Sequence, residues 1–267
     1  MGIDARRNDG LFLCLFIGNK EVIYMKNEIL LHIPHSSVVI PEKYKSDYTA
    51  DLSEELIKMT DLYTDELFDL PFERIVFPVS RLVCDVERFR DDSKEDMAKI
   101  GMGAVYTSCH DLSLLRNMSE KRKNEILENW YDTHHSKFGK TVKEKLNSFG
   151  KCIIIDCHSF PPIPLPYEID KSTDRPDICI GTDSFHTPDE LAEILKKEFL
   201  VRGYSVKENS PFSGAIVPID YYMTEKRVVS VMIEVNRKLY MDDRGKKTDG
   251  YQKVKNDIKN IIMNTFE

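Results

Sequence analysis

The sequence predicts an α/β fold, a three-layer αβα arrangement around a mixed, mostly parallel central sheet. Two observations support this prediction. Short apolar runs rich in β-branched residues alternate with segments of helical periodicity, the order expected when helices cover both faces of a sheet. The 267 residues, 41% of them hydrophobic, show no internal repeat and no linker. We therefore expect a single domain over residues 25–267.

The expected strands are apolar runs that end in polar or glycine-containing turns, as strands buried on both faces do. They cover residues 28–33, 74–79, 151–156, 177–181 and 228–235. In such sheets, ligands and catalytic groups gather at the carboxyl ends of the strands. The residues that follow these runs are therefore the first candidates for a site.

Four segments between the strands have apolar residues at helical spacing together with helix start or stop signals. The expected helices are residues 51–70, capped by Asp51; residues 119–149, ended by Gly150; a helix that begins with a capping box and a proline in Thr187-Pro188-Asp189-Glu190 and ends before Gly203; and residues 250–263.

The first residues carry the only feature that resembles a targeting signal. Leu11–Gly18 is an apolar run after two arginines, but it is too short to span a bilayer and no small-residue cleavage site follows it. Met25 directly precedes the first good strand. We interpret residues 1–24 as an extension, either disordered or translated from an early start; the alternative is an extra edge strand.

Charge and cysteine usage exclude several classes of protein. Lys and Arg number 38 against 45 Asp and Glu, a formal charge of −7, and no sustained basic block offers a nucleic-acid surface. The six cysteines, at positions 14, 84, 109, 152, 157 and 179, form no C-x-x-C pair, a usage typical of reduced thiols. We predict a cytoplasmic protein, monomeric or a small homo-oligomer, that acts on a small molecule and binds neither nucleic acid nor membrane.

Two histidines follow predicted strands and indicate a metal site. His35 lies in the turn after residues 28–33, and His158 lies in the turn after residues 151–156. Neutral imidazole is the commonest zinc ligand, and a turn at the sheet edge leaves a coordination position open. A histidine in such a place is more often a hydrogen-bonded structural residue when taken alone, and it is the two placements together that favour a metal. His32 is a rival to His35 as a ligand.

A catalytic zinc site needs a third protein ligand. Asp61 and Asp65 lie four residues apart on the expected helix 51–70, so both project from one face. Asp61 also shares its row with apolar residues, which draws it toward the core, where an acid requires a partner. A solvated pair of aspartates on a helix surface is the alternative.

Glu234 places a carboxylate near the end of the otherwise apolar strand 228–235. Burial there raises the pKa of a carboxyl group unless it is paired, and such a group suits general acid/base catalysis. The alternative is a structural salt bridge to Arg237 or to another arginine.

Residues 80–90 contain Arg81, Arg88 and Arg90, and guanidinium groups beside a hydrolytic site suit bidentate capture of a substrate carboxylate. The alternative is a solvated charged edge. A turn-rich loop over residues 208–215 includes Gly214, which permits close approach of the backbone to a ligand.

Six motifs in this order resemble the N-formylglutamate amidohydrolase family over residues 28–245. They are Pro-His-Ser-Ser with His35, the pair Asp61 and Asp65, Ser-Arg-Leu-Val-Cys-Asp-Val-Glu-Arg ending at Arg88, Asp-Cys-His-Ser with His158, Asn-Ser-Pro-Phe-Ser-Gly from Asn209 to Gly214, and Ile-Glu-Val-Asn-Arg-Lys-Leu-Tyr with Glu234. The family is similar in turn to the zinc carboxypeptidases. The resemblance implies their phosphorylase/hydrolase-like αβα fold.

The resemblance also implies a role for each matching residue. His35 and His158 are metal ligands, Glu234 is the general acid/base, and Arg88 binds the substrate carboxylate. The carboxypeptidase pattern has a glutamate ligand where this chain has Val38, so the third ligand is assigned to Asp61. The further candidates are Arg81 and His135 in catalysis, and Asn209, Ser213, Gly214 and Arg237 in substrate binding.

The chain departs from the family pattern at Glu87, where the family usually has asparagine. An acid there would repel an anionic substrate if it faced the pocket. Because adjacent residues in extended chain point to opposite faces, we expect Arg88 to face the pocket and Glu87 to turn away. His135 matches a Tyr-x-x-x-His element of the family only loosely.

The implied activity is zinc-dependent hydrolysis of the amide C–N bond of N-formyl-L-glutamate to formate and L-glutamate, the last step of one histidine-degradation route. Another divalent transition metal is an alternative to Zn²⁺. The alternative functions are a zinc amidase or carboxypeptidase acting on another N-acyl amino acid or a cell-wall peptide, and a relative that binds ligand without catalysis.

Overall fold

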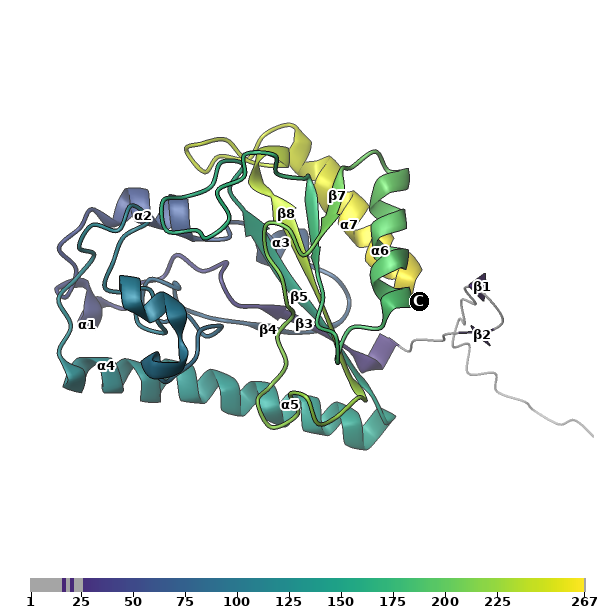
Figure 1. The fold of residues 1–267 in the computed structure, drawn as a ribbon, viewed down its shortest axis with the longest axis horizontal. Helices are drawn as coiled ribbons and strands as arrows, with labels where there is room; N and C mark the ends of the chain where they lie inside the picture. Colours follow the sequence, from purple (N-terminus) through teal and green to yellow (C-terminus); the bar gives the residue numbers. More distant parts are fainter. Residues whose placement is uncertain (1–15, 18–19, 22–25, 267) are drawn as a thin grey trace, which may run out of the picture.

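The computed structural model describes residues 16–17, 20–21 and 26–266. Its centre is a six-stranded sheet with the order β4-β3-β5-β8-β6-β7 (Figure 1). The first four of these strands are parallel, whereas β6 runs antiparallel to β8 and parallel to β7. The predicted mixed, mostly parallel sheet is thus confirmed. The strands are β3 (Ile29–Ile33), β4 (Glu73–Val76), β5 (Cys152–Phe160), β6 (Ile178–Gly181), β7 (Val206–Glu208) and β8 (Val228–Asn236).

Two strands differ from the sequence prediction in a way that affects the site. β5 does not end at Asp156 but continues to Phe160, because β8 pairs with it along its whole length. His158 therefore lies within a strand and not in the turn after it. β4 is shorter than predicted, and the partly exposed edge strand β7 was not predicted.

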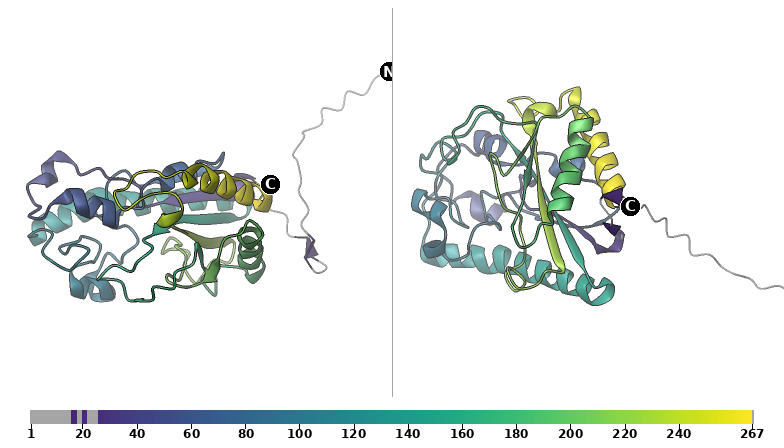
Figure 2. Two further views of the ribbon diagram at one scale, coloured as in Figure 1. Left: turned by 90° about the horizontal axis from the view of Figure 1, so that it is seen from above. Right: turned by 45° about the vertical axis from the view of Figure 1, so that its right-hand side comes forward.

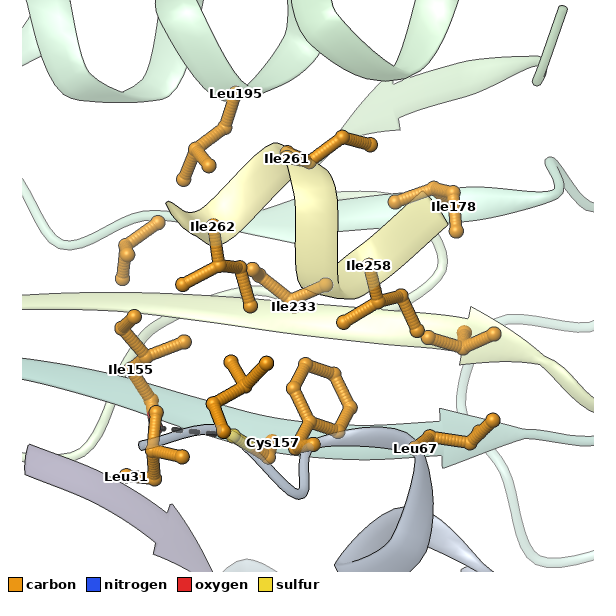
Figure 3. Close-up of a cluster of buried hydrophobic side chains, with 14 of the residues drawn as sticks. Leu31, Leu67, Ile155, Cys157, Ile178, Leu195, Ile233, Ile258, Ile261 and Ile262 are labelled. Carbon is orange, nitrogen blue, oxygen red and sulfur yellow. Dashed lines mark hydrogen bonds between the residues drawn. The ribbon is translucent and has the colours of Figure 1, made fainter. Parts of the chain in front are cut away.

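One face of the sheet carries the main hydrophobic core. Alternate residues of β3, β5, β6 and β8 pack there against α3 (Thr64–Leu67), α6 (Asp189–Val201) and α7 (Gly250–Phe266). Figure 3 shows the α7 side chains of Ile258 and Ile262 next to Ile233 of β8. Helical spacing on α7 and strand alternation on β8 thus produce one continuous apolar layer.

The opposite face is covered in its amino-terminal half by α5 (Thr133–Phe149), which packs on Leu30, Ile154 and Val228 through Phe138 and Val142. α5 continues α4 (Glu120–Ile126) through a π-helical segment, Leu127–Asp132. The predicted helical stretch is confirmed, with Ser119 as N-cap and Gly150 in the left-handed region (φ 80°) at its end. In Figures 1 and 2, α6 and α7 lie next to each other and α5 runs along a different side of the sheet.

The predicted helix 51–70 is wrong as a single element. Its first part is α2 (Leu52–Met59), capped by Asp51 as expected. The chain then leaves the helix at Thr60, and Tyr63 adopts a left-handed conformation (φ 70°) before α3 begins. Asp61 lies in this break. Consequently Asp61 and Asp65 do not share a helix face.

The remaining elements are short. A helix, α1 (Glu42–Lys45), and 3₁₀ turns at Lys26–Glu28, Asp92–Lys94, Asp96–Ile100 and Arg237–Leu239 occupy the connections. α6 ends before Gly203, as predicted, but its expected capping box is absent because the Thr187 hydroxyl donates to the Ser230 carbonyl on β8 (2.6 Å). α7 runs three residues past its predicted end.

Of residues 1–24, the structure describes only β1 (Phe16–Ile17) and β2 (Lys20–Glu21), which pair with each other in a separate two-stranded sheet. The rest of the proposed extension, with Cys14, lies outside the described residues. The other five cysteines are buried, free thiols. Among the helices of the described residues, none has the length and apolar character needed to cross a membrane.

Candidate active site

Ionisable residues gather on one face of the sheet, opposite the main core. Strand register places His32 of β3 beside Asp156 of β5, and His158 of β5 beside Glu234 of β8. Because residues two apart on a strand share a face, Asp156 and His158 point the same way. All four residues are buried. The carboxyl-terminal half of this face is therefore polar, whereas α5 covers the apolar half.

Three of the predicted ligands meet at this face. His158 Nδ1 lies 3.2 Å from Asp61 Oδ2, and His35 Nδ1 lies 3.7 Å from the same oxygen. A backbone hydrogen bond from the Asp61 amide to the His35 carbonyl (3.0 Å) joins the helix break to the turn after β3. His35, Asp61 and His158 thus place one donor atom each within 4.8 Å of one another.

Each of these three side chains is also held in place through its other polar atom, the one that does not face the cluster. Asp85 lies 2.9 Å from His35 Nε2, and Asp156 lies 3.0 Å from His158 Nε2. Arg237 donates to Asp61 Oδ1 (2.8 Å). Carboxylates that fix the distal nitrogen of a histidine are the usual support of metal ligands, since they set its tautomer and orientation.

The donor set fits a divalent transition metal such as zinc. His35 Nδ1 is buried and has no hydrogen-bond partner, which is costly for a polar atom unless something else satisfies it. Although burial opposes ionisation, the hydrogen bond with His158, the nearby His35 and the charge of Arg237 hold the pKa of Asp61 well below its ordinary value. Two imidazole nitrogens and one carboxylate oxygen are a ligand set that zinc accepts.

Glu234 stands beside this cluster with a perturbed acidity. Burial raises the pKa of its carboxyl group to about 8, and the negative charge of Asp61 adds to the effect. Its Oε2 atom is buried without a hydrogen-bond partner. The alternative of a salt bridge to Arg237 is not realised, because Arg237 pairs with Asp61. A carboxyl group with a raised pKa next to a ligand cluster is suited to transferring protons near neutral pH.

Two arginines from the segment after β4 lie near the cluster. Arg81 donates to Asp85 Oδ2 (2.7 Å), and Arg88 lies 3.8 Å from the same oxygen. Tyr106 also donates to this carboxylate (2.5 Å). The Nε atoms of Arg81 and Arg88 are buried and have no hydrogen-bond partner. Both guanidinium groups therefore keep donors available for an anionic ligand.

The expectation that Glu87 turns away from the site is wrong. Its carboxylate lies 3.2 Å from His158 Nε2, 3.7 Å from His35 Nδ1 and 3.6 Å from His32 Nδ1. Alternation of side chains fails here because residues 85–88 form a turn: the Glu87 amide donates to Asp85 Oδ1 (3.0 Å). Glu87 and Arg88 both reach the site.

The other candidates lie around this centre. Arg237 is buried and positions Asp61, with further bonds to Ser159 and the Lys58 carbonyl. His135 lies 2.8 Å from the Val86 carbonyl and so supports the backbone of the Glu87 turn.

The loop over residues 208–215 runs along β6. The Asn209 side chain bonds Thr182, and the Cys179 thiol donates to the Phe212 carbonyl (3.2 Å). A Cβ atom on Gly181 would lie 2.4 Å from the Gly214 carbonyl, so loop and strand are in close contact. Cys179 is the register partner of Glu234 on β8, which puts this loop next to the Glu234 row. Ser213 is exposed.

Two residues that support the candidate ligands were missed as candidates, namely Asp85 and Asp156. Both carry a sequence signal. Asp156 lies two residues before His158 in a run that continues as a strand, so it shares the face of His158. Asp85 precedes the arginine by three residues within a segment already rich in charge. His32 was considered as a ligand, and its Nδ1 lies 2.8 Å from Asp156.

Comparison with known proteins identifies the family of this chain. The model of the N-formylglutamate amidohydrolase family matches residues 27–241. An N-formylglutamate amidohydrolase structure from Ralstonia eutropha JMP134 superposes with a TM-score of 0.78 at 18% identity, covering 89% of this chain and 92% of that one. A gene product from Agrobacterium tumefaciens gives a TM-score of 0.61 at 16% identity, covering 91% and 93%. Among curated proteins, none matches. The chain belongs to the N-formylglutamate amidohydrolase family.

Proposed function

We propose that this protein is a zinc-dependent amidohydrolase that cleaves N-formyl-L-glutamate to formate and L-glutamate, the reaction that gives its family its name. The observation that supports metal dependence is the buried, unpartnered His35 Nδ1, which faces Asp61 Oδ2 beside His158 Nδ1. Its five buried free thiols suit a reducing compartment, and we propose that it acts in the cytoplasm.

Three residues of the site would hold a metal ion, and a fourth would transfer protons. His35, Asp61 and His158 would hold the ion, and the chemistry that a divalent metal supplies at such a site is polarisation of a carbonyl oxygen. Glu234 takes a proton from the attacking water and returns it to the departing nitrogen. Burial of its carboxyl group gives it the raised pKa that this exchange needs.

Arg81 and Arg88 bind the carboxylates of the substrate. Each has an unpartnered Nε donor, and both lie next to Asp85, which fixes their position. Orientation of the amide by such a clamp accounts for a large share of the rate that a hydrolase gains.

Glu87 favours a second candidate function. A carboxylate beside the ligand cluster repels an anionic substrate group. A zinc amidase that acts on another N-acyl amino acid, or on a cell-wall peptide, is therefore the alternative substrate assignment for the same catalytic residues.

Formate release from a panel of N-formyl amino acids tests the proposed function. The protein is stripped with a chelator, reloaded with Zn²⁺ and assayed on N-formyl derivatives of glutamate, aspartate, glutamine, leucine and lysine. The proposal expects the highest kcat/KM on the glutamate derivative and no formate from the stripped protein. Preference for the lysine derivative would instead assign the second function.

Arg88→Lys tests the carboxylate clamp. The variant keeps the positive charge but loses the planar fork, so we expect KM for N-formyl-L-glutamate to rise about tenfold or more while turnover of neutral N-formyl-leucinamide is unaffected. Steady-state kinetics on both substrates provide the measurement. Equal losses on both would mean that Arg88 does not bind the substrate carboxylate.

A further inference from the structure

We propose that a second divalent metal ion binds next to the first, with His32, Glu87 and Asp156 as its ligands. The proposal goes beyond the proposed function. It rests on that function in one respect, since the second ion would lie next to the ion proposed there, with His158 between the two sites. The two groups of residues, His35 with Asp61 and His158, and His32 with Glu87 and Asp156, have no ligand in common.

The donor atoms of the second group are spaced as ligands of one ion. His32 Nδ1 lies 2.8 Å from Asp156 Oδ1 and 3.6 Å from Glu87 Oε1, and all three donors lie within 4.8 Å of one another. Ligands bound at 2.0–2.2 Å in a tetrahedral site stand about 3.4 Å apart. The observed distances of 2.8 Å and 3.6 Å lie on either side of this value.

The charge of the cluster calls for a cation. Asp61 and Asp85 are paired with Arg237 and Arg81, respectively. Among the residues that the structure describes, every ion pair of Glu87 and Asp156 is with a histidine. Neither carboxylate is therefore paired with the permanent positive charge of a lysine or arginine in the described part of the chain. A second ion supplies that charge.

The second site also has support and access. His32 Nε2 lies 3.0 Å from His134 Nε2 on α5, and this contact fixes the orientation of the His32 ring. Asp156 Oδ2 accepts from the Ile216 amide (3.4 Å). The Glu87 side chain is 20% exposed, whereas those of His32 and Asp156 are almost fully buried. An ion can therefore enter from the Glu87 side.

A second ion would explain why the negative charge of Glu87 is compatible with an acidic substrate. Bound between Glu87 and Asp156, it cancels the repulsion that the extra carboxylate would otherwise exert on a substrate held by Arg88. Nitrogen and carboxylate oxygen donors in a one-to-two ratio suit Zn²⁺, Mn²⁺ or Co²⁺.

Metal stoichiometry tests the proposal. The full chain is stripped with a chelator, titrated with Zn²⁺ in a calorimeter, desalted and analysed for zinc by mass spectrometry. We expect two zinc ions per chain for the wild type, one for Glu87→Gln, one for Asp61→Asn and none for the double variant. Co²⁺-loaded protein should lose a different set of visible absorption bands in each single variant.

Glu55→Gln is the matched control, because Glu55 is another buried glutamate next to a histidine, His110 (2.5 Å), outside both sites. It should retain two ions, and circular dichroism verifies the fold of every variant. One ion in the wild type that is lost in Asp61→Asn would overturn the second site and leave the proposed function intact. Two ions in Glu87→Gln would also overturn it. An absence of bound zinc in the wild type would reject both sites.

Discussion

The His158→Ala variant is expected to lose one equivalent of bound zinc and all measurable formate release while retaining its fold. His158 offers Nδ1 to the same point as Asp61 Oδ2, and no other imidazole on β5 replaces it. Loss of a residue that merely supports a ligand reduces metal affinity or activity about 10–100-fold, and loss of a ligand costs more. Zinc content after desalting and formate release under saturating substrate provide the measurements.

His110→Ala is the matched control for this substitution, because His110 pairs with Glu55 away from the site. It should retain its zinc and its turnover. Circular dichroism of both variants distinguishes ligand loss from unfolding, since β5 is central in the sheet and a misfolded variant would lose its metal for a trivial reason. Unchanged zinc content in folded His158→Ala would remove His158 from the ligand set.

Glu234→Gln should lower turnover by about 10²–10⁴ without changing zinc content, because glutamine keeps the shape of the side chain but cannot accept a proton. Stopped assays for formate and zinc analysis on the same sample give both numbers. A variant that lost its zinc would show that Glu234 is a ligand, and a variant with wild-type turnover would show that its role is structural.

The same pair of proteins, stripped of metal, gives a pH-dependent readout. Burial raises the pKa of Glu234 from the ordinary 4.5 to about 8, so the folded state holds this proton more tightly than the unfolded state does. Its stabilising effect is complete below about pH 4.5 and is lost as the pH rises through about 8. The free energy of unfolding of the wild type, relative to Glu234→Gln, should therefore fall between pH 5 and pH 8 in urea denaturation.

Much of the fold follows from hydrophobic pattern alone. The runs that became β3, β6 and β8 are apolar on both faces, and helices α6 and α7 carry clear periodicity. The sequence predicts that β5 ends at Asp156, because the polar residues Asp156 and His158 resemble a turn when the partner strand is not known. Pairing with β8 along nine residues keeps these polar side chains in a strand. Tertiary pairing overrides local composition there.

The candidate site could be predicted where it depended on which strand carries or precedes a residue, although His158 lies within β5 and not in the turn after it. It could not be predicted where it depended on helix breaks and tight turns. His35, His158 and Glu234 were located by their place in the sheet. Asp61 was chosen for a helix face, but it reaches the histidines because the helix stops at Thr60, a break that apolar periodicity does not reveal. The turn at Asp85 likewise brings Glu87 and Arg88 to the same side. Such local hydrogen bonding has no periodic signature.

The position of β8 in the sheet has a consequence for how the protein is made. β8 is the last strand in the chain but lies at the centre of the sheet, between β5 and the pair β6-β7. During synthesis, the two parts of the sheet have no strand to join them until Asn236 has left the ribosome. The same strand carries Glu234. Closure of the sheet and arrival of the Glu234 carboxylate are therefore one event, and a nascent chain that ends before β8 lacks both.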